Sequence, residues 1–422
     1  MNQNRAIASR TAFISGALVV ISPVLVLGQI GANPGWRKEP FKLTSPGKTF
    51  EIGLAGYIQE DFRSYQDWGP ILDSTELRRL RIGVEGRWKR LSFEAEFDPR
   101  KEPPPDPGEG TKYLKNAYVE YRFSKAFHLR GGHFKIPFSP EFLTSSSKID
   151  FVERGIMVDA LDLGRDWGGA ALGEVGDRFR YEVGVFAGDG WGTHERAGTT
   201  GAARIVVIPL TGLEIGGSYT QGHVSADLET LADLAPKGFA GDGPTGFRFS
   251  VRHFVDGRRQ RIGADATLRR GPFGLKGEYS RGAEERKGQG STFEDLSSVI
   301  FNGWSASGTW LVTGDKKRNT IRPAHPVFHG PGAVEIGLRY EWVTVDDDGP
   351  DTGFAGAGNR ARNVRPAGDQ AFTGGVSWWP RQWMRLMGNV VVEKFKDALL
   401  APEPGKAGNY TTLLARLQVS LP

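Results

Sequence analysis

Apolar and polar residues alternate along most of the chain from residue 50 onward. In the first such run, Phe50, Ile52 and Leu54 share one face, whereas Glu51 and Gln59 share the other. Alternation with a period of two predicts β-strands with one apolar and one polar face. Most runs exceed the roughly 5 to 6 residues usual in globular proteins, and this length suits tilted strands that cross a bilayer.

The connections between these runs alternate between short and long, which is typical of an outer-membrane β-barrel. A seventeenth run, Phe247–Phe254, lies inside a long connection. We do not count it as a strand, because single-chain bacterial barrels normally have an even strand number. We therefore predict an all-β fold, a transmembrane antiparallel β-barrel of about 16 strands. The predicted strands are residues 50–63, 77–89, 90–98, 112–123, 126–136, 167–174, 178–187, 200–209, 212–220, 259–270, 273–281, 299–313, 334–346, 369–380, 383–396 and 410–421.

Three connections depart from this regular pattern. Residues 137–166 form a long excursion with three basic and six acidic side chains, and residues 221–258 are longer still. Residues 314–333 stand where a short turn is expected. A long charged connection inside a regular β pattern is usually either a functional loop or a disordered one. By its charge alone, the 137–166 connection would not attract anions.

The N-terminus has the pattern of a secretory signal peptide. Arg5 and Arg10 precede an apolar run that ends at Gly28. We predict a signal peptide at residues 1–28, with cleavage as late as Ala32, although a retained membrane anchor is the alternative. Residues 29–49 would then be a periplasmic segment before the barrel, which is predicted to cover residues 50–422.

Composition narrows the possible functions. The chain has no Cys, which excludes disulfides and thiolate metal sites. No HExxH spacing and no GxSxG motif is present, so we expect neither an enzyme, a metal site nor a cofactor. The formal net charge of +5 mildly favours anionic partners. We expect outer-membrane lipid around the barrel and no nucleic-acid partner.

Several separated motifs resemble one known family. They are LRRLRIGVEGRW (Leu77–Trp88), HFKIPFSPEFLTSSSKIDFVERG (His133–Gly155), GPFGLKGEY (Gly271–Tyr279) and the stretch Leu311–Trp342. In these motifs the chain resembles the phosphate-selective porin family, the porin O and P family. The resemblance runs from about Gly53 to the C-terminus.

The resemblance implies a channel for anions in the outer membrane of a Gram-negative-type bacterium, usually assembled as a homotrimer. It also implies that the third loop, the fifth loop and one periplasmic turn fold into the barrel. These correspond to the three irregular connections, 137–166, 221–258 and 314–333. The 137–166 connection would then be the constriction loop.

Candidate pathway residues come from the motif match and from the alternation. The match places Arg78, Arg79, Lys148 and Arg154 on an anion pathway, and the fifth-loop match adds two further arginines. The alternation puts Arg79 and Arg81 on one lumen face, and puts Arg261 on the lumen face of the strand starting at Arg259. The predicted set is Arg78, Arg79, Arg81, Lys148, Arg154, Arg248, Arg252, Arg259 and Arg261.

Guanidinium groups suit this function because they replace the hydration of an oxyanion with paired hydrogen bonds and stay charged at any working pH. We therefore predict an anion-selective channel for phosphate or similar oxyanions. Alternatively, the arginines are solvated lumen residues balanced by nearby acids, as in a general or other-solute porin with weak ionic preference. Tyr57, where the family often has an arginine, favours that alternative. A structural outer-membrane barrel is a further possibility.

Overall fold

The computed structural model describes residues 37–39, 41–66, 71, 73–100, 113–161, 164–188, 198–224, 238, 241, 243–250, 253–290, 292–347, 364, 366–406 and 408–421. The predicted signal peptide and Arg252 lie outside the described residues. Within the described ranges, no helix is both long and apolar enough to span a membrane.

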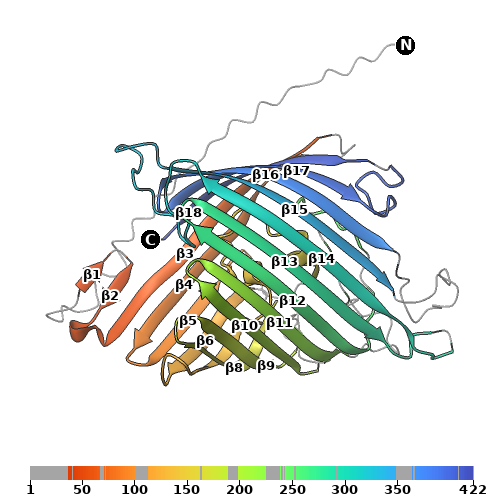
Figure 1. The fold of residues 1–422 in the computed structure, drawn as a ribbon, viewed down its shortest axis with the longest axis horizontal. Helices are drawn as coiled ribbons and strands as arrows, with labels where there is room; N and C mark the ends of the chain where they lie inside the picture. Colours follow the sequence, from red (N-terminus) through yellow and green to blue (C-terminus); the bar gives the residue numbers. More distant parts are fainter. Residues whose placement is uncertain are drawn as a thin grey trace, which may run out of the picture.

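A single antiparallel sheet closes on itself to form a barrel (Figure 1). Two of its 18 strands, β1 and β2, form a short hairpin, which leaves sixteen in the barrel wall. The barrel closes where β18 pairs with β3, for example Ala415 opposite Phe62. The strands are β1 (Arg37–Glu39), β2 (Lys42–Thr44), β3 (Phe50–Gln66), β4 (Ser74–Trp88), β5 (Leu91–Phe97), β6 (Leu114–Arg122), β7 (His128–Lys135), β8 (Arg165–Val175), β9 (Phe179–Phe186), β10 (Thr200–Leu210), β11 (Leu213–Val224), β12 (Gly257–Arg270), β13 (Phe273–Arg286), β14 (Leu296–Leu311), β15 (Ala333–Asp347), β16 (Ala367–Arg381), β17 (Met384–Phe395) and β18 (Tyr410–Ser420).

The alternation of the sequence becomes the two faces of the wall. On β3, Ile58 and Phe62 are exposed on the outer face, whereas Gln59, Asp61 and Arg63 are buried on the inner face. The sixteen predicted strands are confirmed, mostly within three residues of their predicted ends. The excluded seventeenth run is not a barrel strand in its described residues, 247–250 and 253–254.

The hairpin of β1 and β2 was not expected from the sequence. β2 pairs with the start of β3, where Lys42 lies opposite Gly53 and Thr44 lies opposite Glu51. The segment before the barrel therefore extends the sheet by a short hairpin. This hairpin lies at the short-turn end of the barrel.

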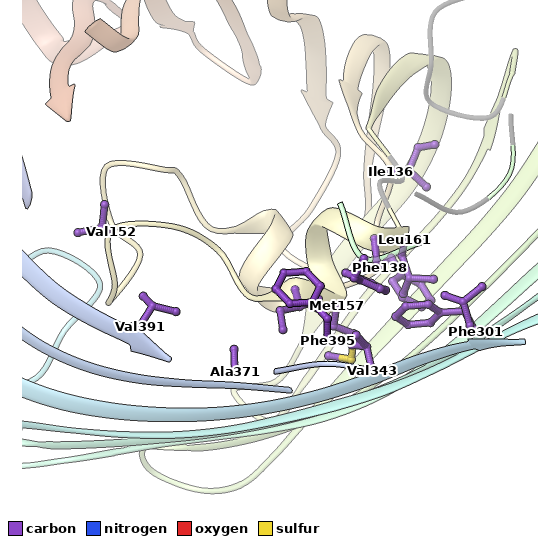
Figure 2. Packing of buried hydrophobic residues seen from close by; sticks show 14 of the residues in the cluster. Ile136, Phe138, Val152, Met157, Leu161, Phe301, Val343, Ala371, Val391 and Phe395 are labelled. Atoms are coloured by element: carbon purple, nitrogen blue, oxygen red, sulfur yellow. The ribbon is translucent and has the colours of Figure 1, made fainter. Parts of the chain in front are cut away.

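The connection between β7 and β8, residues 136–164, folds inside the barrel in its described residues, 136–161 and 164, and we call it the inner loop. It contains two short helices, α1 (Pro140–Leu143) and α2 (Ile156–Leu161). α2 lies against the inner faces of β14 and β15. Met157 of α2 packs in one apolar cluster with Phe301 of β14 and Val343 of β15 (Figure 2).

This apolar cluster explains an exception to the polar lumen. On β15 and β17 the inward side chains Val343 and Val391 are apolar and fully buried, although the lumen of a channel barrel is usually polar. They are covered by the inner loop, so their burial removes apolar surface from water as in a soluble core. The cluster thus fixes the inner loop to one side of the wall.

The other two irregular connections also send residues into the barrel. The backbone carbonyl of Thr245, between β11 and β12, accepts a hydrogen bond of 2.9 Å from Arg63 Nη1 on β3. Lys317, between β14 and β15, pairs with Asp150 of the inner loop and with Glu335 of the wall. Inward folding of all three irregular connections is therefore observed in the described residues.

Two neighbouring glycines of β7 should differ sharply in how much an alanine substitution destabilises the barrel. Gly132 has a φ of +136°, and a Cβ there would lie 2.2 Å from the carbonyl oxygen of Ala117. A Cβ on Gly131 would meet nothing within 4 Å. We expect Gly132→Ala to lower the free energy of unfolding by about 2–4 kcal/mol and Gly131→Ala to change it by less than about 0.5 kcal/mol. Urea unfolding in detergent measures both, and equal midpoints would contradict the prediction.

Candidate functional site

Four arginines of the wall converge on one carboxylate of the inner loop. Arg63 of β3, Arg78 and Arg79 of β4 and Arg416 of β18 all contact Glu153. The Arg78 Nε–Oε1 distance is 2.7 Å, and the other three nitrogen–oxygen distances are 3.1 Å. We call these four side chains the arginine cluster. Strands β4, β3 and β18 are neighbours, so the cluster is built on rigid wall.

A break in strand register lets two consecutive arginines join the cluster. Gln59 pairs with Arg79, but Glu60 pairs with Leu77, so Arg78 is an extra residue between them. Such a β-bulge re-aims one side chain, which here turns Arg78 inward beside Arg79. Strict alternation would have placed Arg78 on the outer face.

The positive charge of the cluster is only partly balanced. Arg416 makes a bidentate contact with Asp61, with nitrogen–oxygen distances of 2.6 and 2.7 Å. Four guanidinium groups therefore face two buried carboxylates, those of Asp61 and Glu153. Glu76 also approaches Arg63 and Arg78, at 3.6 and 3.7 Å, but it is largely exposed and solvent screens its charge.

These contacts keep Glu153 ionised. Burial by itself would raise the pKa of Glu153, but the guanidinium groups of Arg79, Arg78 and Arg416 outweigh it. The pKa of Glu153 therefore lies well below its ordinary value of 4.5. A carboxylate of this kind stabilises the fold fully above its unfolded pKa, and that contribution is lost only as the pH falls through the depressed folded pKa.

The anchoring of the inner loop should therefore be insensitive to mild acid. At pH 5 Glu153 stays ionised, so single-channel recordings at pH 5 should show no more flicker than recordings at pH 7. Flicker that sets in between pH 7 and pH 5 in the native chain but not in Glu153→Gln would show that the pKa of Glu153 is raised above its ordinary value and not lowered.

Donors on the wall also hold the backbone carbonyls of the inner loop. Because this loop has little regular secondary structure, its carbonyl groups need outside partners once they are buried. These partners come from strands on all sides of the barrel. The pairs are Arg204 to Phe138, Lys135 to Phe142, Leu143 and Thr144, Gln59 to Ser146, Gln418 to Ser147, Arg385 to Ile149 and Asp150, Arg339 to Glu153 and Arg154, and Arg261 to Leu161.

Arg154 bonds within the inner loop. Its Nη2 donates to the carbonyl of Thr144 at 2.7 Å, and its Nη1 donates to Ser146 Oγ at 3.0 Å. Both acceptors follow α1, so Arg154 ties the second half of the loop to the first.

Arg81 belongs to a second group of cations beside the cluster. It contacts Glu96 and Asp98 at 3.4 Å each. Arg165 of β8 lies within electrostatic reach of both Arg81 and Arg154. This part of the wall is therefore positive, with carboxylates interspersed.

The predicted residues on β12 and in the 221–258 connection lie elsewhere. Arg259 is buried against Glu284 of β13, and Arg261 is buried behind α2, where it donates to the carbonyl of Leu161. Arg248 is exposed on the segment that folds in between β11 and β12. The structure does not bring these three to the arginine cluster.

Two cavities lie inside the barrel at its short-turn end, with volumes of about 780 and 480 Å³. Ser145, Lys148 and Asn319 line both of them. Lys148 is exposed, and its Nζ makes no hydrogen bond or ion pair with any residue that the structure describes. Of the eight predicted pathway residues that are described, Lys148 alone borders these cavities.

The described residues contain no group of three or more His, Asp or Glu side chains placed to hold a metal ion. The geometry is thus a barrel with an anchored inner loop, lined inside by charged side chains.

Comparison with known families decides what kind of barrel this is. The family described as "Phosphate-selective porin O and P" matches residues 52–421, nearly the whole chain. The chain belongs to this porin family. It is accordingly a channel of the bacterial outer membrane and not an enzyme. The short-turn end of the porin is therefore the periplasmic end.

Solved porin structures share the fold at low sequence identity. The anion-selective porin from Comamonas acidovorans has a TM-score of 0.54 and 13% identity, covering 88% of this chain and 99% of that one. The outer membrane channel DcaP of Acinetobacter baumannii has a TM-score of 0.56 and 12% identity, covering 89% and 99%. The trimer form of OmpT of Vibrio cholerae has a TM-score of 0.54 and 11% identity, covering 88% and 99%. A search of curated proteins finds no match.

Several residues that build this site were not singled out by the sequence. Glu153 stood in the loop motif that carries the family resemblance but was not predicted as a site residue, and Arg63 was only a polar position on a strand. Lys317 lies in the irregular turn and reaches the inner loop through Asp150. The irregular length of that turn was the one available signal, and it identified the segment but not the residue.

Proposed function

We propose that this porin forms an anion-selective diffusion channel for phosphate or similar small oxyanions. The observation that carries the proposal is the position of Lys148. It is an exposed cation at the place where the two periplasmic cavities meet, and it has no partner among the described residues. An ammonium group is compact and strongly hydrated, so it attracts an anion without forming the bidentate hydrogen bonds of a guanidinium. Weak attraction allows an anion to enter and also to leave.

The positive electrostatic potential of the arginine cluster adds to the attraction that Lys148 exerts on anions. The partly balanced charge of the cluster lies on the same side of the inner loop as Ser146 and Ser147, which immediately precede Lys148. Because the protein around the cluster is a poorer dielectric than water, this field is less screened than that of surface charges. In this proposal the arginines mainly hold the loop and raise the local potential, whereas Lys148 meets the permeating ion.

A general porin with weak ionic preference is the second candidate. The larger cavity is lined by six Lys or Arg and five Asp or Glu, and the smaller one by five of each. Such a balance favours a modest anion preference over a strict one. The two candidates differ in whether phosphate binds on its way through.

We further propose that the porin assembles as a homotrimer, as the family resemblance implies and the trimer form of OmpT supports. Cross-linking in mild detergent should then give a trimer as the largest abundant species.

Planar-bilayer recording tests the proposed function. Chloride current through the wild-type channel should fall as phosphate is added, with half-block in the millimolar range or below and recovery on washout. Current that is indifferent to phosphate, together with weak anion preference, would instead identify the general porin. Absence of conducting steps from correctly folded protein would contradict both candidates.

A further inference from the structure

The arginine cluster has the features of an anion site that is already occupied. One oxygen of Glu153, Oε1, contacts Arg63, Arg78 and Arg416, and the other, Oε2, contacts Arg79. Three cationic partners on one carboxylate oxygen are more than an ordinary ion pair needs. The arrangement is the one expected around a bound anion.

The guanidinium groups have supports that do not involve Glu153. Arg79 Nη1 donates to Gln59 Oε1 at 3.0 Å, Arg63 Nη1 donates to the carbonyl of Thr245 at 2.9 Å, and Arg416 is held by Asp61. These contacts leave Arg63, Arg79 and Arg416 in place if the Glu153 carboxylate is removed, whereas Arg78 keeps only its 3.7 Å contact with Glu76. The site is therefore preorganised by the wall, whereas its anion is carried by a loop.

The cluster also has a route to the lumen. The Arg78 side chain is 33% exposed, whereas those of Arg63, Arg79 and Arg416 are at most 10% exposed. A small anion could thus reach the cluster past Arg78. Without any anion, several buried guanidinium groups would repel one another at a considerable cost.

From this geometry we infer that the arginine cluster is an anion-binding site whose resident anion is the porin's own Glu153. The class of ligand that fits is a small carboxylate or oxyanion, because it must replace two carboxylate oxygens. In the native chain Glu153 is tethered and competes at high effective concentration, so added anions displace it poorly. Removal of Glu153 should open the site. The inference does not require that the channel select phosphate.

Chemical rescue tests the inference. Glu153→Ala should unfold at a lower temperature than wild type in chloride, and sodium formate or phosphate should raise its unfolding midpoint in a saturable way. The wild-type midpoint should not respond to the same additions. In bilayers, formate should also suppress the extra current flicker of Glu153→Ala.

Glu141→Ala is the matched control. Glu141 is another loop carboxylate that contacts a wall arginine, Arg339 at 3.4 Å, but it faces no cluster. Formate should not restore this variant. If Glu153→Ala is too unstable to isolate, Glu153→Gln keeps the side-chain shape and should bind formate at least tenfold more tightly than wild type. Equal responses of Glu153→Ala and Glu141→Ala, or none from any folded Glu153 variant, would overturn the inference.

Discussion

Lys148→Glu should abolish the anion preference of the channel and move its reversal potential toward the cation side. The substitution replaces an unpartnered ammonium by a carboxylate at the place where both periplasmic cavities meet. The change is two charge units, and the other basic residues that line the two cavities are already matched in number by acidic ones. In a KCl gradient we expect the anion-to-cation permeability ratio to fall at least tenfold, which corresponds to about 1.4 kcal/mol in the relative energy of the two ions.

Lys48→Glu provides a control with the same charge change. Lys48 is exposed in the segment before β3 and borders neither cavity. It should leave the reversal potential close to wild type. If both variants shift it equally, the preference comes from the overall charge of the porin and not from Lys148.

Met157→Asp should release the inner loop and raise the single-channel conductance severalfold. Met157 is buried between α2 and the inner faces of β14 and β15, and a carboxylate there would have no partner in an apolar cluster. Burying an unpaired charge costs several kcal/mol, which is more than any one of the hydrogen bonds that hold the loop contributes, and it removes the apolar attachment of α2 to the wall. The loop should therefore leave the wall while the barrel itself stays folded.

Asp159→Asn is the control for this variant, because Asp159 is the one exposed residue of α2. Heat-modifiable migration in gels shows whether each barrel is folded, and bilayer recording gives the conductance. A folded Met157→Asp porin with wild-type conductance would show that the inner loop does not restrict the pore.

The sequence was sufficient to predict the wall. The alternation seen at Ile58, Gln59 and Phe62 depends only on which face of the strand meets lipid. It can therefore be recognised from neighbouring residues in the sequence. The irregular connections were predictable for the same reason, since they interrupt that pattern. Inward folding followed from the family resemblance, because length alone does not say on which side of a wall a loop lies.

The candidate site was less predictable because it depends on long-range contacts. The bulge that turns Arg78 inward appears only in the pairing of β4 with β3. Val343 is an apolar residue on the inner face of the wall, and only the packing of α2 against β15 explains it. Arg261 was predicted on the lumen face and does face inward, but the loop carbonyl that it holds, that of Leu161, is 100 positions away in the sequence.

These contacts change the role expected of the wall arginines. The sequence suggested that they would meet the permeating anion, whereas most of those described donate to loop carbonyls or contact loop carboxylates. Arg385 and Arg339 hold consecutive parts of the loop in this way. Anion preference and loop attachment thus use the same side chains, so substitution of a wall arginine should affect both properties.

The zero-current potential of the wild-type channel in a tenfold gradient of potassium phosphate tests the central claim most directly. We predict a potential with the sign of a channel more permeable to phosphate than to potassium. A potential of the opposite sign, measured on the same folded porin, would contradict the proposal that it conducts oxyanions past Lys148.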